Sequence, residues 1–269
     1  MARAINLSRP TAQYKWLFKL LRQFIFYVFV LLIWEGISRS GIWPDYLFVG
    51  PTAVAHSLIV GFQKGTMITA ILVSMRRLFL GYVISVVIGV ILGLLIGSNR
   101  YIEETLGSLV LGLQALPSVC WIPLALLWFG LSEQAMLFVV VMGALFSVTL
   151  SVDAGIKNTP PVYVKAARNM GARGLALNTQ VILPAALPSI LTGLKQGWTF
   201  AWRSLMAAEL LYITPSLGGL LDNGRNFGDI ALIFAVIIII IVIGLTIDNV
   251  IFNPLERLIR TRWGFAGAH

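Results

Sequence analysis

The sequence predicts an all-α protein that crosses a membrane several times, and its composition and hydrophobic pattern both predict this fold. Of its 269 residues, 58% are hydrophobic and only 12% are charged, whereas a typical soluble domain is about 25% charged. A bilayer accommodates such a chain because a helix of about 20 apolar residues crosses its hydrocarbon core. The apolar runs are continuous and do not alternate, which favours helices over the strands of a barrel.

Six apolar runs predict six transmembrane helices within one domain that covers residues 1–269. They fall at Phe24–Ser38, Leu78–Gly97, Leu106–Phe129, Ala135–Ile156, Leu187–Leu211 and Ile230–Ile251. The first run is short for a bilayer, so we expect its helix to extend toward the N-terminus. The six helices with their connections make a core at residues 24–262, and residues 1–23 are expected to form a cytoplasmic amphipathic helix, centred on Gln13–Phe24.

The distribution of basic residues predicts that both termini are cytoplasmic. With the N-terminus inside, most lysines and arginines fall in cytoplasmic segments and few fall in the outer loops, as the positive-inside rule requires. The net charge of +9 is explained by this asymmetry, so we expect a lipid bilayer and no nucleic acid as a partner.

Small residues recur at four-residue spacing in two of the predicted spans. Such steps let helices approach closely where lipid offers no hydrophobic drive to association, so we expect helix packing at these positions. The glycines are Gly89, Gly93, Gly97, Gly193 and Gly197.

A polar, basic segment separates the fourth and fifth spans, on the predicted cytoplasmic side. Val162–Met170 is predicted to be a short helix, because Pro160-Pro161 can start it and Gly171 can end it. Within it Lys165-Ala166-Ala167 is followed by three residues and Gly171, and nine further residues lead to Val181-Ile182-Leu183-Pro184.

This spacing resembles the coupling loop of the permease subunits of ABC importers, whose signature reads Glu-Ala-Ala, three residues, Gly, nine residues and Ile-x-Leu-Pro. Lys165 replaces the acidic residue here, and Val181 replaces the isoleucine. The resemblance implies a type I ABC importer fold, in which residues 158–186 form the coupling loop for a separate ATPase. The implied coupling residues are Val162, Lys165, Ala166, Ala167, Arg168, Gly171, Leu183 and Pro184.

Other segments resemble the branch of this family that serves nitrate, sulfonates, taurine and bicarbonate. They are Leu116-Pro117-Ser118 with the following Trp121–Gly130, Ala207-Ala208-Glu209, and Ser74–Arg77 with Gly81-Tyr82. The resemblance implies two ATPase subunits that bind ATP and Mg²⁺, a second permease copy or a paralogue, and a periplasmic or lipid-anchored substrate-binding protein. It also implies a multi-pass protein of the bacterial inner membrane, and none of these segments names a substrate.

A polar stripe on the fifth span is the candidate translocation path. At 100° per residue Thr192, Gln196, Thr199 and Arg203 lie on one helix face, and polar groups at membrane depth are functional candidates by default. We expect this stripe to line an anion route, with Arg203 supplying positive potential. The alternative is polar packing between helices, or a pair between Arg203 and Glu209. Arg76, at the outer end of the second span, and Glu209 complete the candidate path.

Other function classes have less support in the sequence. No G-x-x-x-x-G-K-[ST] motif is present, so an ATPase must be another chain. No catalytic residue, metal site or cofactor is expected in this chain, because His56 and His269 make no metal pair and no catalytic arrangement is convincing. An ion-coupled secondary transporter stays open as the alternative function, although the internal repeats expected of one are not clear.

Overall fold

The structure is a computed structural model that describes residues 12–44, 47–212 and 214–262. The regular elements of this part of the chain are all helices. Its α-helices are α1 (Ala12–Arg39), α2 (Pro51–Gln63), α3 (Thr66–Ser98), α4 (Arg100–Ile102), α5 (Ser108–Gln114), α6 (Ile122–Phe129), α7 (Glu133–Lys157), α8 (Pro161–Asn169), α9 (Gly174–Leu177), α10 (Leu183–Glu209), α11 (Leu217–Phe227), α12 (Ile230–Ile247) and α13 (Asn253–Arg262). A 3₁₀ turn, η2 (Ser118–Trp121), and three π-helical turns, η1 (Glu103–Gly107), η3 (Asn178–Ile182) and η4 (Asp248–Phe252), join them.

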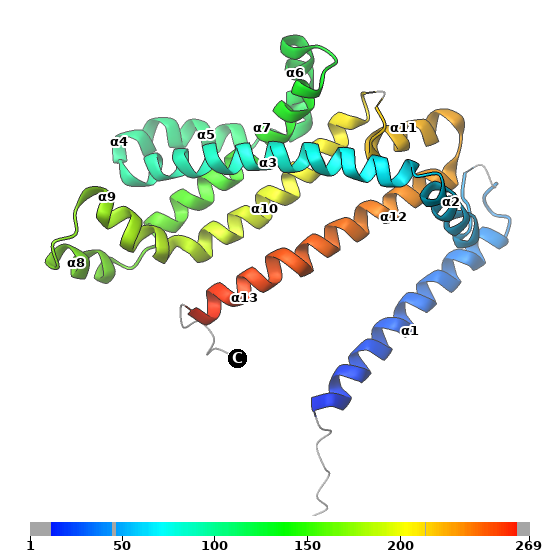
Figure 1. Cartoon of the computed structure of the whole chain (residues 1–269), viewed down its shortest axis with the longest axis horizontal. Coiled ribbons are helices and arrows are strands. Elements are labelled where there is room, and N and C mark those ends of the chain that lie inside the picture. The colour runs from blue at the N-terminus through cyan, green and yellow to red at the C-terminus, as the bar shows by residue number, and fades with distance from the viewer. Residues whose placement is uncertain (1–11, 45–46, 213, 263–269) are drawn as a thin grey trace, which may run out of the picture.

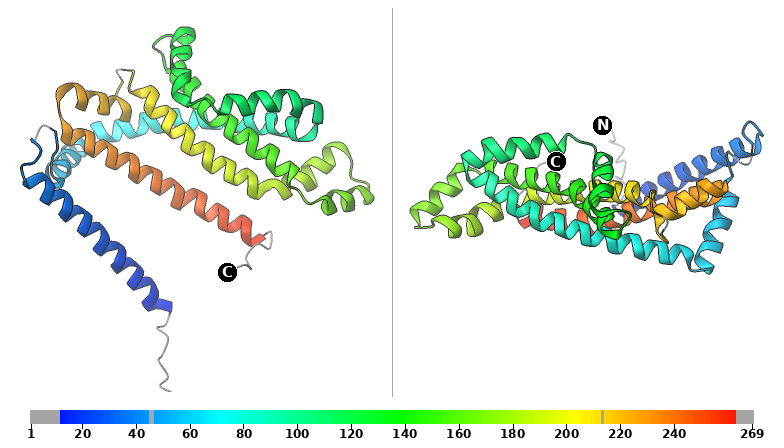
Figure 2. Two further views of the ribbon diagram at one scale, coloured as in Figure 1. Left: turned by 180° about the vertical axis from the view of Figure 1, so that it is seen from behind. Right: turned by 90° about the horizontal axis from the view of Figure 1, so that it is seen from above.

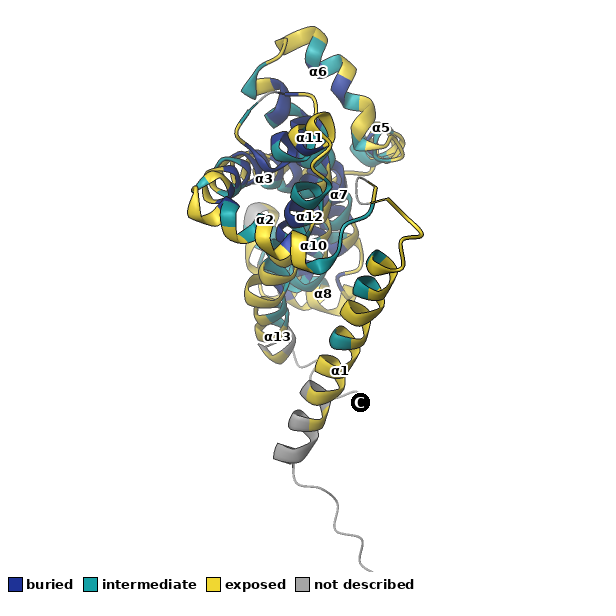
Figure 3. Cartoon of the chain, turned by 90° about the vertical axis from the view of Figure 1, so that its right-hand side faces the viewer, coloured by how far each residue is buried: buried dark blue, intermediate teal, exposed yellow. Residues whose placement is uncertain are grey.

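The core of the molecule is a layer of three long helices, with α7 packed between α3 and α10 (Figures 1 and 2). The most apolar window of α7 is 61% buried, whereas that of α3 is 28% buried. In Figure 3 the dark blue of buried residues is concentrated in these central helices. The end of this layer that carries α2 and α11 lies opposite the end that carries α8 (Figure 1).

The predicted small-residue steps are the places where α3 and α10 approach α7, as the sequence led us to expect. A side chain at Gly93 would bring its Cβ within 2.5 Å of the Val152 Cβ and 2.6 Å of the Thr149 carbonyl oxygen. Gly89 and Gly97 face α7 in the same way, as do Gly193 and Gly197 on α10. The glycines therefore permit a helix separation that any larger residue would prevent.

Four of the predicted spans coincide with long apolar helices. The candidate spans of the described chain are Leu21–Arg39, Thr66–Ser98, Glu133–Lys157 and Ile230–Ile259. The first extends toward the N-terminus, as predicted. The helix α1 also runs without a break through the predicted amphipathic segment Gln13–Phe24; most of the side chains between residues 12 and 20 lie outside the described ones, so their placement on the inner surface stays a prediction.

The third predicted span, Leu106–Phe129, is not one straight helix. The chain turns by 102° between the helical pair Arg100–Gln114 and Ser118–Phe129. The break occurs there because a residue before proline is pushed out of the α region, and Leu116 precedes Pro117, whose own backbone is extended at φ −55° and ψ 136°. Counted as one broken span, this pair raises the number of candidate spans to five.

The fifth predicted span corresponds to α10, which has 27 residues. This length of helix is about 40 Å at 1.5 Å per residue, but α10 is not among the helices that are apolar enough to be counted as spans. Its polar residues lie on one face, and its other face is buried against α7.

Candidate coupling loop and membrane path

The helix α8 is a short helix with defined ends, and it lies at the end of the molecule opposite α2 and α11 (Figure 1). It begins at Pro161, whose fixed φ suits the first helical position, and ends at Asn169. The sequence predicted this helix to within a residue at each end. The short α9 and the π-helical turn η3 follow, and they lead directly into α10.

Gly171 terminates α8 in a Schellman motif, which confirms the predicted helix stop. Its φ is +90°, a conformation that side-chain-bearing residues rarely adopt. The Ala172 amide donates to the Ala167 carbonyl at 2.9 Å, and the Gly171 amide donates to the Arg168 carbonyl at 3.0 Å. These two bonds satisfy carbonyls that a helix end would otherwise leave unpaired, so the loop has a fixed shape.

One face of α8 is buried against the protein and the other is exposed. Ala167 is only 8% exposed. By contrast Val162 is 70% exposed and Met170 is 88% exposed, although both are apolar. The side chains of Lys165 and Arg168 are exposed beside them. The loop thus presents a small apolar surface with a basic border.

The remaining predicted coupling residues lie along the same loop. Ala166 is exposed on α8, and Leu183 and Pro184 are half-buried at the start of α10. Four residues after α8 separate it from one continuous helical segment, formed by α9, η3 and α10, that begins at Gly174.

The predicted polar stripe on α10 lies on its free face. Thr192, Gln196, Thr199 and Arg203 are all exposed, while Gly193, Gly197 and Ala201 on the opposite face are buried. The Thr192 and Thr199 hydroxyls donate to the carbonyls of Pro188 and Lys195, each at 3.1 Å. No other described helix of this chain covers the stripe.

The two cations of α10 have different surroundings. Lys195 pairs with Asp248 at 2.6 Å, which ties α10 to the segment after α12. Arg203 has no carboxylate partner among the residues that the structure describes. The alternative that Arg203 pairs with Glu209 is not observed, because the Glu209 carboxylate is taken by Arg77.

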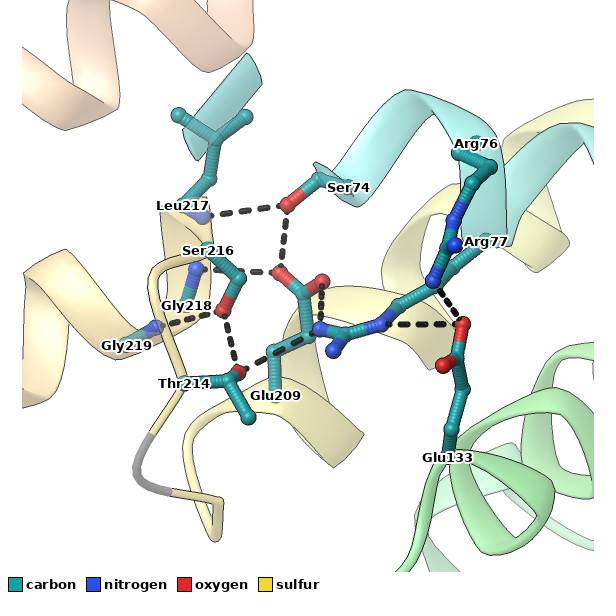
Figure 4. A network of polar contacts seen from close by, with 10 residues as sticks. All are labelled: Ser74, Arg76, Arg77, Glu133, Glu209, Thr214, Ser216, Leu217, Gly218 and Gly219. Atoms are coloured by element: carbon teal, nitrogen blue, oxygen red, sulfur yellow. Dashed lines mark hydrogen bonds and ion pairs between the residues drawn. The ribbon is translucent and has the colours of Figure 1, made fainter. Parts of the chain in front are cut away.

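Glu209 is the centre of a buried polar network that joins three helices (Figure 4). Its side chain is 0% exposed. One carboxylate oxygen accepts from Arg77 at 3.1 Å, and the other accepts from the Ser74 hydroxyl at 2.7 Å and from the Gly218 amide at 3.1 Å. The Ser74 oxygen in turn accepts from the Leu217 amide at 3.0 Å. The network therefore fixes the start of α11 to α3 and α10.

The structure separates Glu209 and Arg76 from the exposed stripe. Glu209 is enclosed in the network, and Arg76 pairs with Glu133 at the start of α7. Arg77 also lies 3.7 Å from Glu133, so one carboxylate borders both arginines. The sequence did not identify Ser74 or Glu133 as partners, because Ser74 is 135 positions from Glu209 and Glu133 is 57 positions from Arg76, and such distant residues give no local signal of contact.

A pocket adjoins the polar stripe at the break between α5 and α6. Its volume is about 370 Å³, and its lining includes residues 114–119, Ser147 and Arg203. The buried oxygens Gln114 Oε1 and Ser147 Oγ have no hydrogen-bond partner. Sequence reasoning missed both residues; the only available signal was a glutamine three residues before Pro117 within an apolar run. Among the described residues no group of three potential metal ligands occurs.

The sequence matches a family of known proteins. Residues 85–260 match the family model described as the binding-protein-dependent transport system inner membrane component. That range includes α7, the predicted coupling loop at residues 158–186, α10 and α12.

Two curated relatives and one solved structure are similar along most of their lengths. The putative aliphatic sulfonates transport permease protein SsuC of Escherichia coli K12 is 32% identical over 91% of this chain and 92% of its own length. The taurine transport system permease protein TauC of the same organism is 26% identical over 92% of this chain and 94% of its own length. A chain of the inward-facing MetNI methionine ABC transporter aligns with a TM-score of 0.63 and 18% identity, over 72% of this chain and 96% of that one.

Proposed function

Because the chain belongs to the family of inner-membrane components of binding-protein-dependent transport systems, and is thus an ABC importer permease subunit, we propose that it moves a small anion into the cytoplasm by alternating access. The substrate belongs to the class of sulfonates, taurine, nitrate and bicarbonate. The named functions of the relatives SsuC and TauC support the sulfonate and taurine members of this class. The guanidinium of Arg203, which has no carboxylate partner in the described part of the chain, supports an anion.

The single observation that carries this proposal is the exposed, rigidly terminated helix α8. Apolar Met170 and Val162 are 88% and 70% exposed, and two hydrogen bonds across Gly171 hold the end of the helix in place. Two ATPase subunits, which bind the ATP and Mg²⁺, dock on this loop in two permease copies. Their closure pushes α8, and α9, η3 and α10 carry the displacement into the membrane.

The exposed polar face of α10 supports a second permease copy. Polar side chains at membrane depth do not face lipid, and nothing else in the described chain covers Thr192, Gln196, Thr199 and Arg203. A second copy or a paralogue, related by a two-fold axis, would face this stripe across a watery passage. The stripe then lines the route. In this arrangement the four apolar helices, the broken α5–α6 pair and α10 make six spans, and both ends of the chain are cytoplasmic.

The outer end supports a docking place for a substrate-binding protein. The helices α2 and α11 lie together at the end remote from α8 (Figure 1). The buried Glu209 network holds this end in one shape, which a docking protein requires. The location we propose is the bacterial inner membrane, with α8 on the cytoplasmic side.

The test is co-expression of the chain with its ATPase and reconstitution of the purified complex in liposomes. We expect the ATPase to co-purify with the chain in detergent, and uptake of a sulfonate to require ATP, Mg²⁺ and the binding protein. Uptake that follows an ion gradient without ATP would contradict the proposal and favour a secondary transporter.

A further inference from the structure

The exposed face of α8 has an apolar ridge along its centre. Val162 and Ala166 are four residues apart and so share one side of the helix, and Met170, which follows the last helical residue, continues the same line. All three are exposed, Val162 to 70% and Met170 to 88%. Side chains at this spacing form a ridge that packs into a groove of a partner surface. The ridge therefore fits an apolar groove.

A cationic edge runs along one side of this ridge. Lys165 and Arg168 are three residues apart, so their side chains leave α8 on the same side, and both are exposed. The other side of the ridge carries Tyr163, which is uncharged and 56% exposed. The exposed face of α8 is therefore positively charged on one edge only.

The chain offers no acidic residue to neutralise this edge. No aspartate or glutamate occurs between residues 154 and 208. Asp153, the last acidic residue before that stretch, is paired with Lys157 at 2.7 Å, and Glu103 pairs with the same lysine at 2.8 Å. Within the described residues neither Lys165 nor Arg168 makes an ion pair. A protein that covers this edge must supply carboxylates, because a charge removed from water without a partner is costly.

Lys165 also reverses the charge of the family signature. The signature has glutamate at this position, whereas this chain has lysine, followed by Arg168 on the same edge. A partner surface that complements a glutamate is positively charged there, and such a surface would repel both cations of this chain. The sign of the charge on the partner must therefore be reversed as well.

We propose that the ATPase subunit docks on α8 through an apolar groove that has aspartate or glutamate side chains along one lip. The ridge at Val162, Ala166 and Met170 enters the groove, and Lys165 and Arg168 meet the carboxylates of the lip. This inference rests on the proposed function, because it gives the chemistry of the partner that drives transport. It also makes the cationic edge a determinant of specificity, since an ATPase with a basic lip is excluded by like-charge contact.

A carbodiimide cross-link tests whether Lys165 meets a carboxylate of the ATPase. The reagent activates a carboxylate, and the lysine amine displaces the activating group as a urea, so an amide bond forms without a spacer between groups already in contact. The purified complex of the full chain with its ATPase is treated in detergent, digested and analysed by mass spectrometry. We expect an amide between Lys165 and an aspartate or glutamate of the ATPase.

Two other lysines control this reaction. Lys157 lies 2.8 Å from Glu103, and the two side chains are 38% and 43% exposed, so a link between them shows that the reagent reaches the α8 end of the protein. Lys64 is exposed at the opposite end and should give no link to the ATPase. A link between Lys157 and Glu103 without any from Lys165 to the ATPase would overturn the acidic lip.

Reversal of the charge measures its contribution to affinity. Lys165→Glu should weaken binding of the labelled ATPase to the chain in detergent at least about tenfold, because it places like charges together. Lys64→Glu makes the same change at the opposite end and should leave the affinity unchanged. Circular dichroism spectra confirm that each variant is folded. Unchanged affinity in Lys165→Glu would contradict the proposed lip.

The same variants distinguish a wrong partner surface from a wrong function. If the reconstituted complex imports a sulfonate with ATP while Lys165→Glu binds the ATPase and transports normally, the acidic lip is wrong and the function stands. If no ATPase binds the wild-type chain and import does not depend on ATP, the proposed function itself fails.

Discussion

Replacement of Glu209 by alanine is expected to destabilise the folded protein by about 3–5 kcal/mol, the cost of leaving a buried charge without its partner. Arg77 would stay buried, with only Glu133 at 3.7 Å as a remaining carboxylate. The Ser74 hydroxyl and the Gly218 amide would lose their acceptor as well. Unfolding of the purified chain in detergent, followed by circular dichroism, measures the loss.

Two further variants separate the contribution of the Glu209 charge to stability from that of its hydrogen bonds. Glu209→Gln keeps the size and one acceptor oxygen, but its amide nitrogen would face the Gly218 amide or the Arg77 guanidinium. We therefore expect an intermediate loss of about 1–3 kcal/mol. The double change Arg77→Met with Glu209→Leu removes both charges, so it should cost less than the two single changes added together.

Arg76→Met is the control for this series. Arg76 also pairs with a carboxylate, that of Glu133, but its side chain is 59% exposed. An exposed pair contributes about 0–1 kcal/mol, so its loss should be small. If Glu209→Ala costs no more than Arg76→Met, the network does not hold α3, α10 and α11 together as described.

Replacement of Gly171 by valine is expected to uncouple transport while leaving the membrane helices folded. The φ of +90° at Gly171 is strained for a β-branched residue by about 1–3 kcal/mol. This strain is enough to lower the population of the correctly terminated α8 by roughly tenfold. We therefore expect ATP-dependent uptake by the reconstituted complex to fall about tenfold, whereas the yield of folded chain should change little.

The controls for this variant test conformation directly. Gly171→Asn should keep most of the activity, because asparagine tolerates the left-handed region. Gly112→Val places the same side chain where nothing lies within 4 Å, so it should leave uptake near normal. Full uptake by Gly171→Val would show that the fixed shape of the loop is not required.

Periodicity and turn chemistry in the sequence predicted the parts of this fold that depend on local chemistry. The limits of α8 follow from Pro161 and Gly171, and the close approach of α3 and α10 to α7 follows from glycines at four-residue spacing. The polar face of α10 follows from a 100° rotation per residue. Each of these signals lies within a few turns of chain.

The features that the sequence did not predict depend on contacts between distant residues or on a local break. Glu209 contacts Ser74 and Arg77 because of the way α3 and α10 align, and no local pattern in the sequence specifies this alignment. Pro117 indicates a bend in the third span, but hydropathy averages over the break and does not give the size of the 102° turn. The unpaired oxygens of Gln114 and Ser147 become apparent only when the side chains around them are placed.

A cross-link from the tip of α8 to the ATPase tests directly whether α8 is the docking site of the ATPase. The exposed Cys120 is first replaced by serine, and Met170, 88% exposed, is replaced by cysteine and joined to a short photoactivatable maleimide. Phe227, 84% exposed on α11 at the opposite end, serves as the matched site. We expect a cross-link to the ATPase from position 170 and none from position 227 in a transporting complex. An ATPase that supports transport but never cross-links to position 170 would show that α8 is not its docking site.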